Sequence, residues 1–155
     1  MEHVDVDDID NWISPADSKR SLSKALATEH LAVNHYELAP GDAFSFGYHR
    51  HETQEELFYV IEGEATFDTE DGTVSVGAGE AVRFAPGEWQ HGYNGGDDRV
   101  VALALGAPAD AGETEIIRRC PDCEARRQVH IESVNDREAL VAVCEECGAE
   151  TVRYS

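Results

Sequence analysis

The sequence predicts an almost all-β protein, in which an antiparallel barrel or sandwich is followed by a small metal-stabilised unit. Three observations predict this fold class. Short apolar alternations of period two, separated by Gly, Pro and Asp, recur between residues 22 and 105. No stretch sustains the 3.6-residue period of an amphipathic helix, so βαβ units are disfavoured. The four cysteines form two Cys-x2-Cys pairs, both after residue 115.

The expected elements begin with an acidic leader, residues 1–20, which holds only a short helical turn within residues 8–13. Strands are then expected at seven alternations, residues 31–38, 44–48, 57–61, 65–69, 73–76, 81–84 and 100–105. Asp71-Gly72 favours a tight hairpin turn, because glycine readily adopts positive φ. The expected barrel core comprises Leu57, Phe58, Val60, Phe67, Val74, Val76, Val82 and Leu103.

Composition and charge both change after residue 105, which divides the chain into two expected units. Residues 21–107 are expected to form the barrel, and residues 108–115 a linker rich in small residues. Residues 116–155 are expected to form the second unit, with strands at 128–134 and 139–143. The first 115 residues carry 24 acids and 6 bases, whereas the last 40 carry 8 and 6. We expect the linker to couple the units only weakly.

The formal charge of −20, from 32 acids against 12 bases, restricts the partners of the chain. It disfavours nucleic acid and anionic membranes, which a surface of this sign repels. It is typical of a protein suited to high salt, such as one from a halophilic archaeon, because salt screens repulsion between the acids. The N-terminal segment lacks the basic region of a signal peptide, and no apolar run approaches the ~18 residues of a membrane helix. We therefore expect a cytoplasmic protein.

Histidines and a glutamate lie where a metal site is expected. His49 and His51 are two residues apart after a strand, so both side chains lie on one face. Glu56 lies at the start of the next strand, and His91 follows Pro86-Gly87. Imidazoles with one carboxylate are a normal ligand set for one divalent transition metal, here Mn, Fe, Co, Ni or Zn.

These residues resemble the cupin superfamily. Its first motif, G-x5-H-x-H-x3,4-E-x6-G, is matched by His49, His51, Glu56 and Gly63, although the opening glycine is absent. Glu55 fits the same spacing, but the distance to Gly63 and the parity along the strand favour Glu56. The resemblance covers residues 25–106 and implies a double-stranded β-barrel, the cupin or jelly-roll fold.

The second cupin motif, G-x5-P-x-G-x2-H-x3-N, is approached less closely. Pro86 to His91 keeps the family interval. Gly79 lies one residue too far from Pro86, Glu88 stands at the second glycine, and Asn94 comes one residue early. The resemblance implies that His91 completes the ligand set begun by the first motif.

The four cysteines form the most specific pattern in the chain. Cys120-x2-Cys123 and Cys144-x2-Cys147 are separated by twenty residues, the spacing of a four-cysteine zinc site. The region resembles a zinc ribbon, in which a zinc ion with four thiolates has a structural role. Two disulfides would need an oxidising compartment and a redox centre would need a βαβ context, and the sequence indicates neither.

The leading functional hypothesis is a mononuclear metal-binding cupin that takes a small molecule in its barrel. The resemblance implies an oxygenase, a decarboxylase or an isomerase as reaction classes and does not select one. The alternative is a non-enzymatic module that senses a metabolite or metal, and whose ribbon contacts a protein or nucleic-acid partner. A homodimer through the barrel sheet and a protein partner for the ribbon are further expectations.

Several arginines are candidates for contacts with anions. Arg83, on the strand that leads to Pro86, is the candidate to pair with a substrate carboxylate, or else it is a solvated strand residue. Four arginines flank the first cysteine pair and either contact phosphate or pair with nearby acids: Arg118, Arg119, Arg126 and Arg127.

Overall fold

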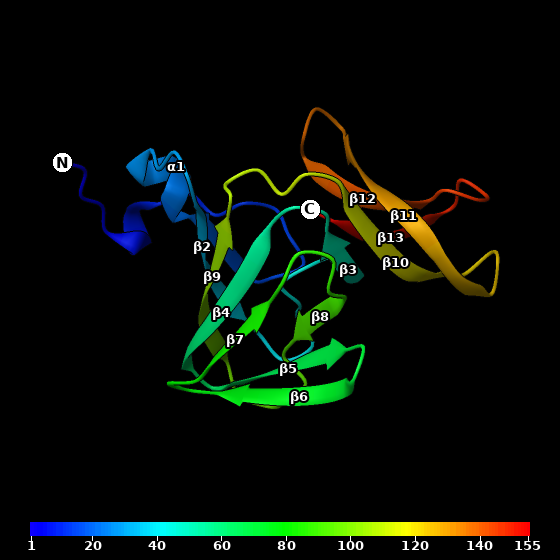
Figure 1. The fold of residues 1–155 in the computed structure, drawn as a ribbon. Coiled ribbons are helices and arrows are strands. Elements are labelled where there is room, and N and C mark those ends of the chain that lie inside the picture. The colour runs from blue at the N-terminus through cyan, green and yellow to red at the C-terminus, as the bar shows by residue number, and fades with distance from the viewer.

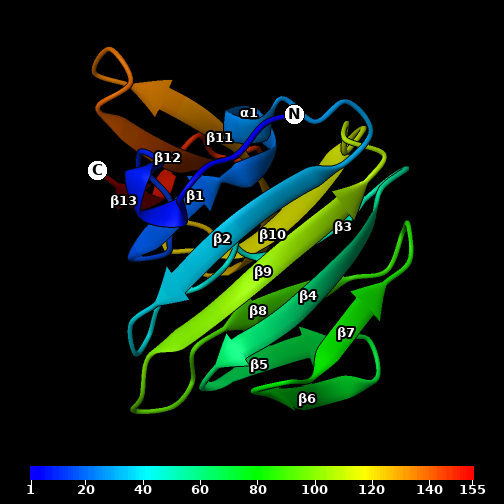
Figure 2. The same cartoon turned by 90° about the vertical axis from the view of Figure 1, so that its left-hand side faces the viewer.

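The computed structural model describes residues 1–155, which form two antiparallel β-sheets (Figures 1 and 2). The elements are η1 (Val6–Asp8), β1 (Ser18–Ser21), α1 (Leu22–Leu26), β2 (Ala32–Leu38), β3 (Tyr48–His51), β4 (Glu55–Glu62), β5 (Glu64–Thr69), β6 (Gly72–Gly77), β7 (Ala81–Phe84), β8 (Gln90–Tyr93), β9 (Val100–Ala107), β10 (Thr114–Cys120), β11 (Ala125–Val134), β12 (Ala139–Cys144) and β13 (Glu150–Tyr154). The first sheet has the order β1-β2-β9-β4-β7, and the second β13-β12-β11-β10-β3-β8-β5-β6. The expected all-β class is confirmed.

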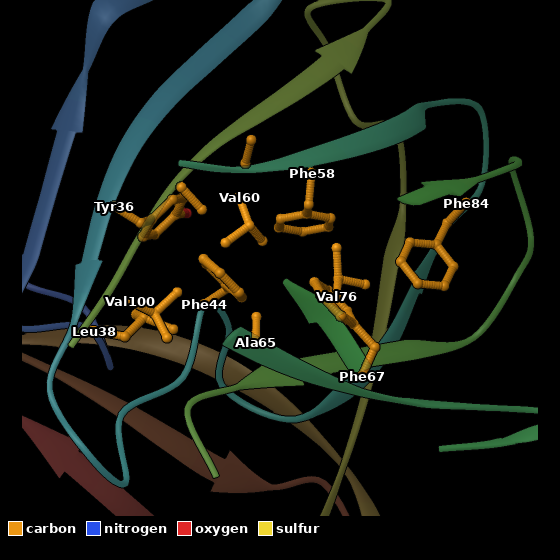
Figure 3. Close-up of a cluster of buried hydrophobic side chains, with 12 residues drawn as sticks. Tyr36, Leu38, Phe44, Phe58, Val60, Ala65, Phe67, Val76, Phe84 and Val100 are labelled. Carbon is orange, nitrogen blue, oxygen red and sulfur yellow. The ribbon is translucent and has the colours of Figure 1, made fainter. Parts of the chain in front are cut away.

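The barrel core lies where the first sheet faces strands β5 and β6 of the second sheet (Figure 3). Phe44, Phe58 and Phe67 form its centre, with ring centroids 4.9 to 5.8 Å apart. Burying each of these rings contributes about 1.5–3 kcal/mol to folding. Of the expected core, Phe58, Phe67, Val60 and Val76 are buried, and Val82 packs against them.

Three of the expected core residues are not in the core. Leu57 and Val74 are 36% and 41% exposed, and Leu103 is half-buried. The reason is strand alternation: Leu57 adjoins the buried Phe58, and Leu103 lies between the inward-facing Ala102 and Ala104. Leu57 and Tyr59 of β4 therefore point outward and pair across the strands with Leu105 and Leu103 of β9.

Five of the seven barrel strands expected from alternation lie within observed strands, as do the two expected in the second unit, and the expected strand 31–38 exceeds β2 by one residue. Of residues 44–48, only Tyr48 is in a strand, because the chain bends there and Gly47 approaches the backbone of Ile117 too closely for a side chain. The expected turn at residues 8–13 is instead a 3-10 turn at η1, where the Asp5 side chain accepts a hydrogen bond from Asp7. Alternation missed β1, β8, β10 and β13, which are short or polar.

Strands β10–β13 form the C-terminal blade, which projects from the barrel at the upper right of Figure 1. Its first strand, β10, pairs with β3 from Thr114 opposite His51 to Ile117 opposite Tyr48. The blade thus continues the second barrel sheet, so the expectation of weak coupling is wrong. The boundary at residues 108–115 stays a prediction, although β10 begins inside it. No helix is long and apolar enough to span a membrane.

Candidate metal centres

Strand β3 directs two imidazoles into the barrel. His49 is 5% exposed, and the ring centroids of His49 and His51 lie 5.0 Å apart. The Nδ1 atom of His49 lies 2.9 Å from the carbonyl oxygen of Gly47, to which it donates, and Nδ1 of His51 lies 2.9 Å from the hydroxyl of Thr114. Holding Nδ1 in this way fixes each ring and directs Nε2 inward, as outer contacts of metal-binding histidines do.

Strand β4 brings Glu56 to the same point. Its Oε2 lies 3.1 Å from Nε2 of His51 and 3.9 Å from Nε2 of His49. Burial by itself would raise the pKa of Glu56, but the hydrogen bonds and positive charge of the two histidines outweigh it and lower the pKa to about 2. Glu55 points to the outer face. The structure therefore places Glu56, and not Glu55, beside the histidines.

The donor set of this group, called here the barrel site, fits a divalent metal. Ligand atoms of His49, His51 and Glu56 all lie within 4.8 Å of one another. Two imidazoles and one carboxylate that face one point are a known arrangement for a divalent transition metal with open positions. These three predicted residues are thus brought together.

The structure does not bring His91 to the barrel site, which differs from the expectation. Side chains alternate along β8, so the buried Gln90 points inward and His91 points to the other face. There His91 lies 3.4 Å from the Ser45 hydroxyl, and burial lowers its pKa to about 4. Gln90 takes the expected place of His91.

Gln90 closes the fourth side of the barrel site. Its Nε2 lies 2.9 Å from Oε2 of Glu56, to which it donates, and 3.2 Å from Nε2 of His49. Its Oε1 is buried without a hydrogen-bond partner. A half-turn of the amide exchanges the two atoms and directs the unpartnered oxygen toward the histidines, where a cation would satisfy it.

A signal for Gln90 was present in the sequence. If Gln90 stands at the histidine of the second cupin motif, then Gly79, Gly87 and Asn94 all fall at their motif positions. The departures seen with His91 then reduce to two substitutions, Ala85 for proline and Gln90 for histidine. The spacing of the other motif residues therefore indicates the inward-facing position at β8 better than the residue type of His91 does.

Arg83 is also absent from the barrel site. Its Nε donates to Oε2 of Glu55 at 2.6 Å on the outer face of β4 and β7, and its side chain is 57% exposed. The interpretation as a solvated strand residue agrees with this position better than the one as a substrate-binding residue.

The barrel site opens into a cavity of about 350 Å³. Leader residues Trp12, Ile13 and Pro15 line it, and so does Leu140 from the blade, so three parts of the chain enclose it. Lys19 is the only lysine or arginine on its wall. The Lys19 Nζ lies 5.8 Å from the ring centroid of Tyr36 and has no carboxylate partner within ion-pair distance.

The environment of Lys19 combines burial with a nearby anion. Burial lowers the pKa of Lys19, while the negative charge of Glu56 opposes that shift. Lys24, the other lysine of the chain, lies outside the cavity, with its Nζ 5.1 Å from the ring centroid of Trp12. Sequence reasoning did not select Lys19, because β1 is short and polar and carries no motif.

The four cysteines form a second centre at one end of the blade. No disulfide is formed. The sulfurs of Cys120 and Cys147 are 3.5 Å apart, and those of Cys123 and Cys144 are 4.0 Å apart. A tetrahedral zinc site with bonds of about 2.3 Å separates its sulfurs by about 3.8 Å, so the cluster fits zinc. Backbone N–H groups of Cys147 and Glu146 lower the pKa of Cys144 to about 7, whereas the hydrogen bond with Cys147 raises the pKa of Cys123 to about 12. The opposite shifts arise because one thiolate in the cluster disfavours ionisation of its neighbours.

Comparison with known proteins shows that this barrel has the cupin fold. Residues 34–106 match a family model described as a cupin domain. The chain is similar to a polyketide cyclase from Streptomyces resistomycificus, with a TM-score of 0.65 and 22% identity over 80% of this chain and 90% of that one. It is also similar to a sugar phosphate isomerase of the cupin superfamily from Silicibacter pomeroyi, with a TM-score of 0.61 and 22% identity over 96% and 91%.

A third similar structure is the oxalate decarboxylase of Bacillus subtilis, with a TM-score of 0.58 and 19% identity over 70% of this chain and 30% of that one. No match is found among curated proteins. Identities this low establish a shared fold and no shared activity. The barrel therefore has the cupin fold, and the family match supports the cupin superfamily.

Proposed function

We propose that this chain, whose barrel has the cupin fold, binds one divalent transition metal at His49, His51 and Glu56 and uses it to hold a small anionic molecule. The observation that carries the proposal is the convergence of three donor groups, one buried and two half-buried, on a cavity with a single amine on its wall. Cys120, Cys123, Cys144 and Cys147 hold a separate, structural zinc ion, as in a zinc ribbon.

The ligand set favours Mn or Fe among Mn, Fe, Co, Ni and Zn. Gln90 replaces an imidazole by an amide oxygen, which is a harder ligand. Oxygen ligands suit Mn, and two histidines with one carboxylate and open positions suit Fe(II). The unpartnered Oε1 of Gln90 supports its role as a fourth ligand.

The anionic class of the small molecule follows from Lys19 and the metal. A dication and an ammonium group on one cavity wall attract a carboxylate, and the half-buried position strengthens that attraction. The aromatic and aliphatic residues of the wall, such as Trp12, Phe44 and Leu140, fit an apolar body on the same molecule. A cavity of about 350 Å³ holds a small metabolite.

The metal is tested by elemental analysis of protein purified without chelator. The parent is expected to contain zinc and a second, exchangeable ion. His49→Ala/His51→Ala is expected to lose the exchangeable ion and keep the zinc, whereas the matched control His91→Ala keeps both. Loss of the exchangeable ion in His91→Ala, with no effect of Gln90→Ala, would refute the assigned ligand set.

The anion is tested by calorimetric titration of the Mn-loaded protein with oxalate and acetate. Lys19→Met is expected to weaken binding about tenfold, the value of one hydrogen bond to a charged group. Lys24→Met is the matched control, because it removes the same charge beside the same tryptophan outside the cavity. Equal effects of the two substitutions would reject a specific role for Lys19.

Metal or metabolite sensing is a second candidate function, favoured by the connection between the two centres. His51 contacts Thr114 of β10, and His49 pairs in register with Ile116 of the same strand. A metal ion in the barrel site would then change the stability of β10 and of the blade, whose surface would contact the partner. Hydrogen exchange in β10–β13 that is unchanged by Mn would exclude this relay.

A further inference from the structure

A second cleft lies outside the barrel, on the outer face of the second sheet, where its barrel strands meet the blade. Its volume is about 670 Å³. The barrel contributes Tyr48, Asp68 and His91, and the blade contributes arginines from β10 and β11. Because side chains alternate along β3, Tyr48 faces this cleft while His49 faces the barrel cavity. The cleft is therefore distinct from the barrel site.

The arginines of this cleft lack the partners that other arginines of the chain have. Six of the ten arginines lie within 4.0 Å of a carboxylate. The four that do not are Arg118, Arg119, Arg126 and Arg137, and the first three line the cleft. In a chain with 32 acids, three arginines without a carboxylate partner in one place indicate a positive site that is available to an external anion.

Two of these arginines repel each other. Arg119 and Arg126 are directly opposite in the β10–β11 pairing. Like charges at such positions, with Cβ atoms about 5 Å apart, destabilise a sheet. An anion bound between them would convert the repulsion into attraction.

The surroundings hold the guanidinium groups in place. Arg126 lies 5.1 Å from the ring centroid of Tyr48, and Tyr48 stacks on Trp89 at 5.2 Å. Arg118 donates from Nη1 to the carbonyl oxygen of Phe46, and its Nε is buried without a partner. The one acid of the cleft, Asp68, accepts hydrogen bonds from Thr73 and Tyr93 through Oδ1.

We propose that this cleft binds a small phosphomonoester, with its phosphate among Arg118, Arg119 and Arg126. Guanidinium groups bind phosphate in a bidentate manner, and three of them match the three terminal oxygens better than the two of a carboxylate. A long polyanion is disfavoured, because the rest of a surface with a charge of −20 repels it. The ring of Tyr48, which is half-buried and stacks on Trp89, lines the same cleft and offers an apolar contact to the esterified group.

The test is a thermal-shift and calorimetric titration with inorganic phosphate, glycerol 3-phosphate and AMP, at constant ionic strength set with KCl. The parent is expected to bind these probes and to gain thermal stability. Arg119→Gln/Arg126→Gln is expected to weaken binding at least tenfold and to abolish the gain. Arg137→Gln is the matched control, because it removes an unpaired arginine outside the cleft.

Two further measurements separate this proposal from other roles. Without phosphate, the melting temperature of Arg119→Gln/Arg126→Gln should equal or exceed that of the parent, with its zinc retained, because a repulsive pair has been removed. A lower melting temperature or lost zinc would assign these arginines to the fold and overturn the proposal. Phosphate binding that persists in His49→Ala/His51→Ala supports a site apart from the barrel. If a single-stranded RNA binds more tightly than all three probes, the cleft is a nucleic-acid surface and the proposal is overturned.

Discussion

Loss of the zinc ion proposed for the blade should weaken the metal binding proposed for the barrel, although the two sites have separate ligands. The perturbation is Cys120→Ser/Cys123→Ser, which removes half of the zinc ligands. Structural zinc contributes about 10–16 kcal/mol of apparent binding free energy in comparable peptides. A whole domain is stable by only about 5–15 kcal/mol, so the blade should unfold.

The consequence for the barrel follows from the sheet order. Strand β3 lies between β10 and β8, and its pairing with β8 consists of His49 opposite Gln90 alone. Unfolding of the blade therefore removes most of the pairing that positions the two histidines, together with the 2.9 Å contact between His51 and Thr114. Loss of one such outer contact typically lowers metal affinity 10- to 100-fold, and we expect the Kd for Mn to rise by about that factor.

The assay is calorimetric titration of Mn into chelator-treated, zinc-reloaded parent and variant protein, with limited proteolysis of both. Thr114→Val serves as the intermediate control, because it removes the hydrogen bond and leaves the zinc in place. An unfolded blade, cut after residue 113, together with a Kd for Mn equal to that of the parent would refute the reasoning. The barrel would then hold β3 without β10.

Four further predictions concern single features of the chain. Gln90→His should complete a three-histidine set, raise the affinity for Ni and Zn more than for Mn, and be measurable by competition between these metals. In the metal-free protein, Glu56→Gln should lower the free energy of unfolding at pH 7 by about 3 kcal/mol. The reason is that the pKa of Glu56 is about 2 in the folded protein and 4.5 in the unfolded chain, so its ionised form stabilises the fold above pH 4.5. Denaturant titrations should show that the difference between parent and variant shrinks as the pH falls toward 2. The melting temperature should rise steeply between low and molar KCl as salt screens the acids, and a flat profile would remove the expectation of a high-salt protein. Tyr59, 41% exposed beside Leu103 on the outer face of the first sheet, marks the expected homodimer surface, and Tyr59→Asp should convert dimer to monomer in sedimentation at molar KCl.

The local pattern of the sequence determined the fold class and most of the strands. Period-two alternation is a direct consequence of strand geometry, so the apolar runs that became β2, β4 and β9 were readable without a structure. Spacing likewise determined the grouping of His49 and His51, because two residues on one strand share a face. The spacing of the cysteines also predicted their cluster, because the two cysteines of each pair lie in one turn.

Only the tertiary structure decided which side chains lie together in a cavity or on one face of a sheet. The choice between His91 and Gln90 depends on a one-residue shift in the register of β8, and a one-residue shift moves a side chain to the opposite face of a sheet. Lys19 reaches the cavity because β1 pairs with β2 at the edge of the first sheet, a contact between polar residues that leaves no apolar pattern. The continuity of blade and barrel depends on hydrogen bonds between the backbones of β3 and β10, which no side chain in the sequence encodes.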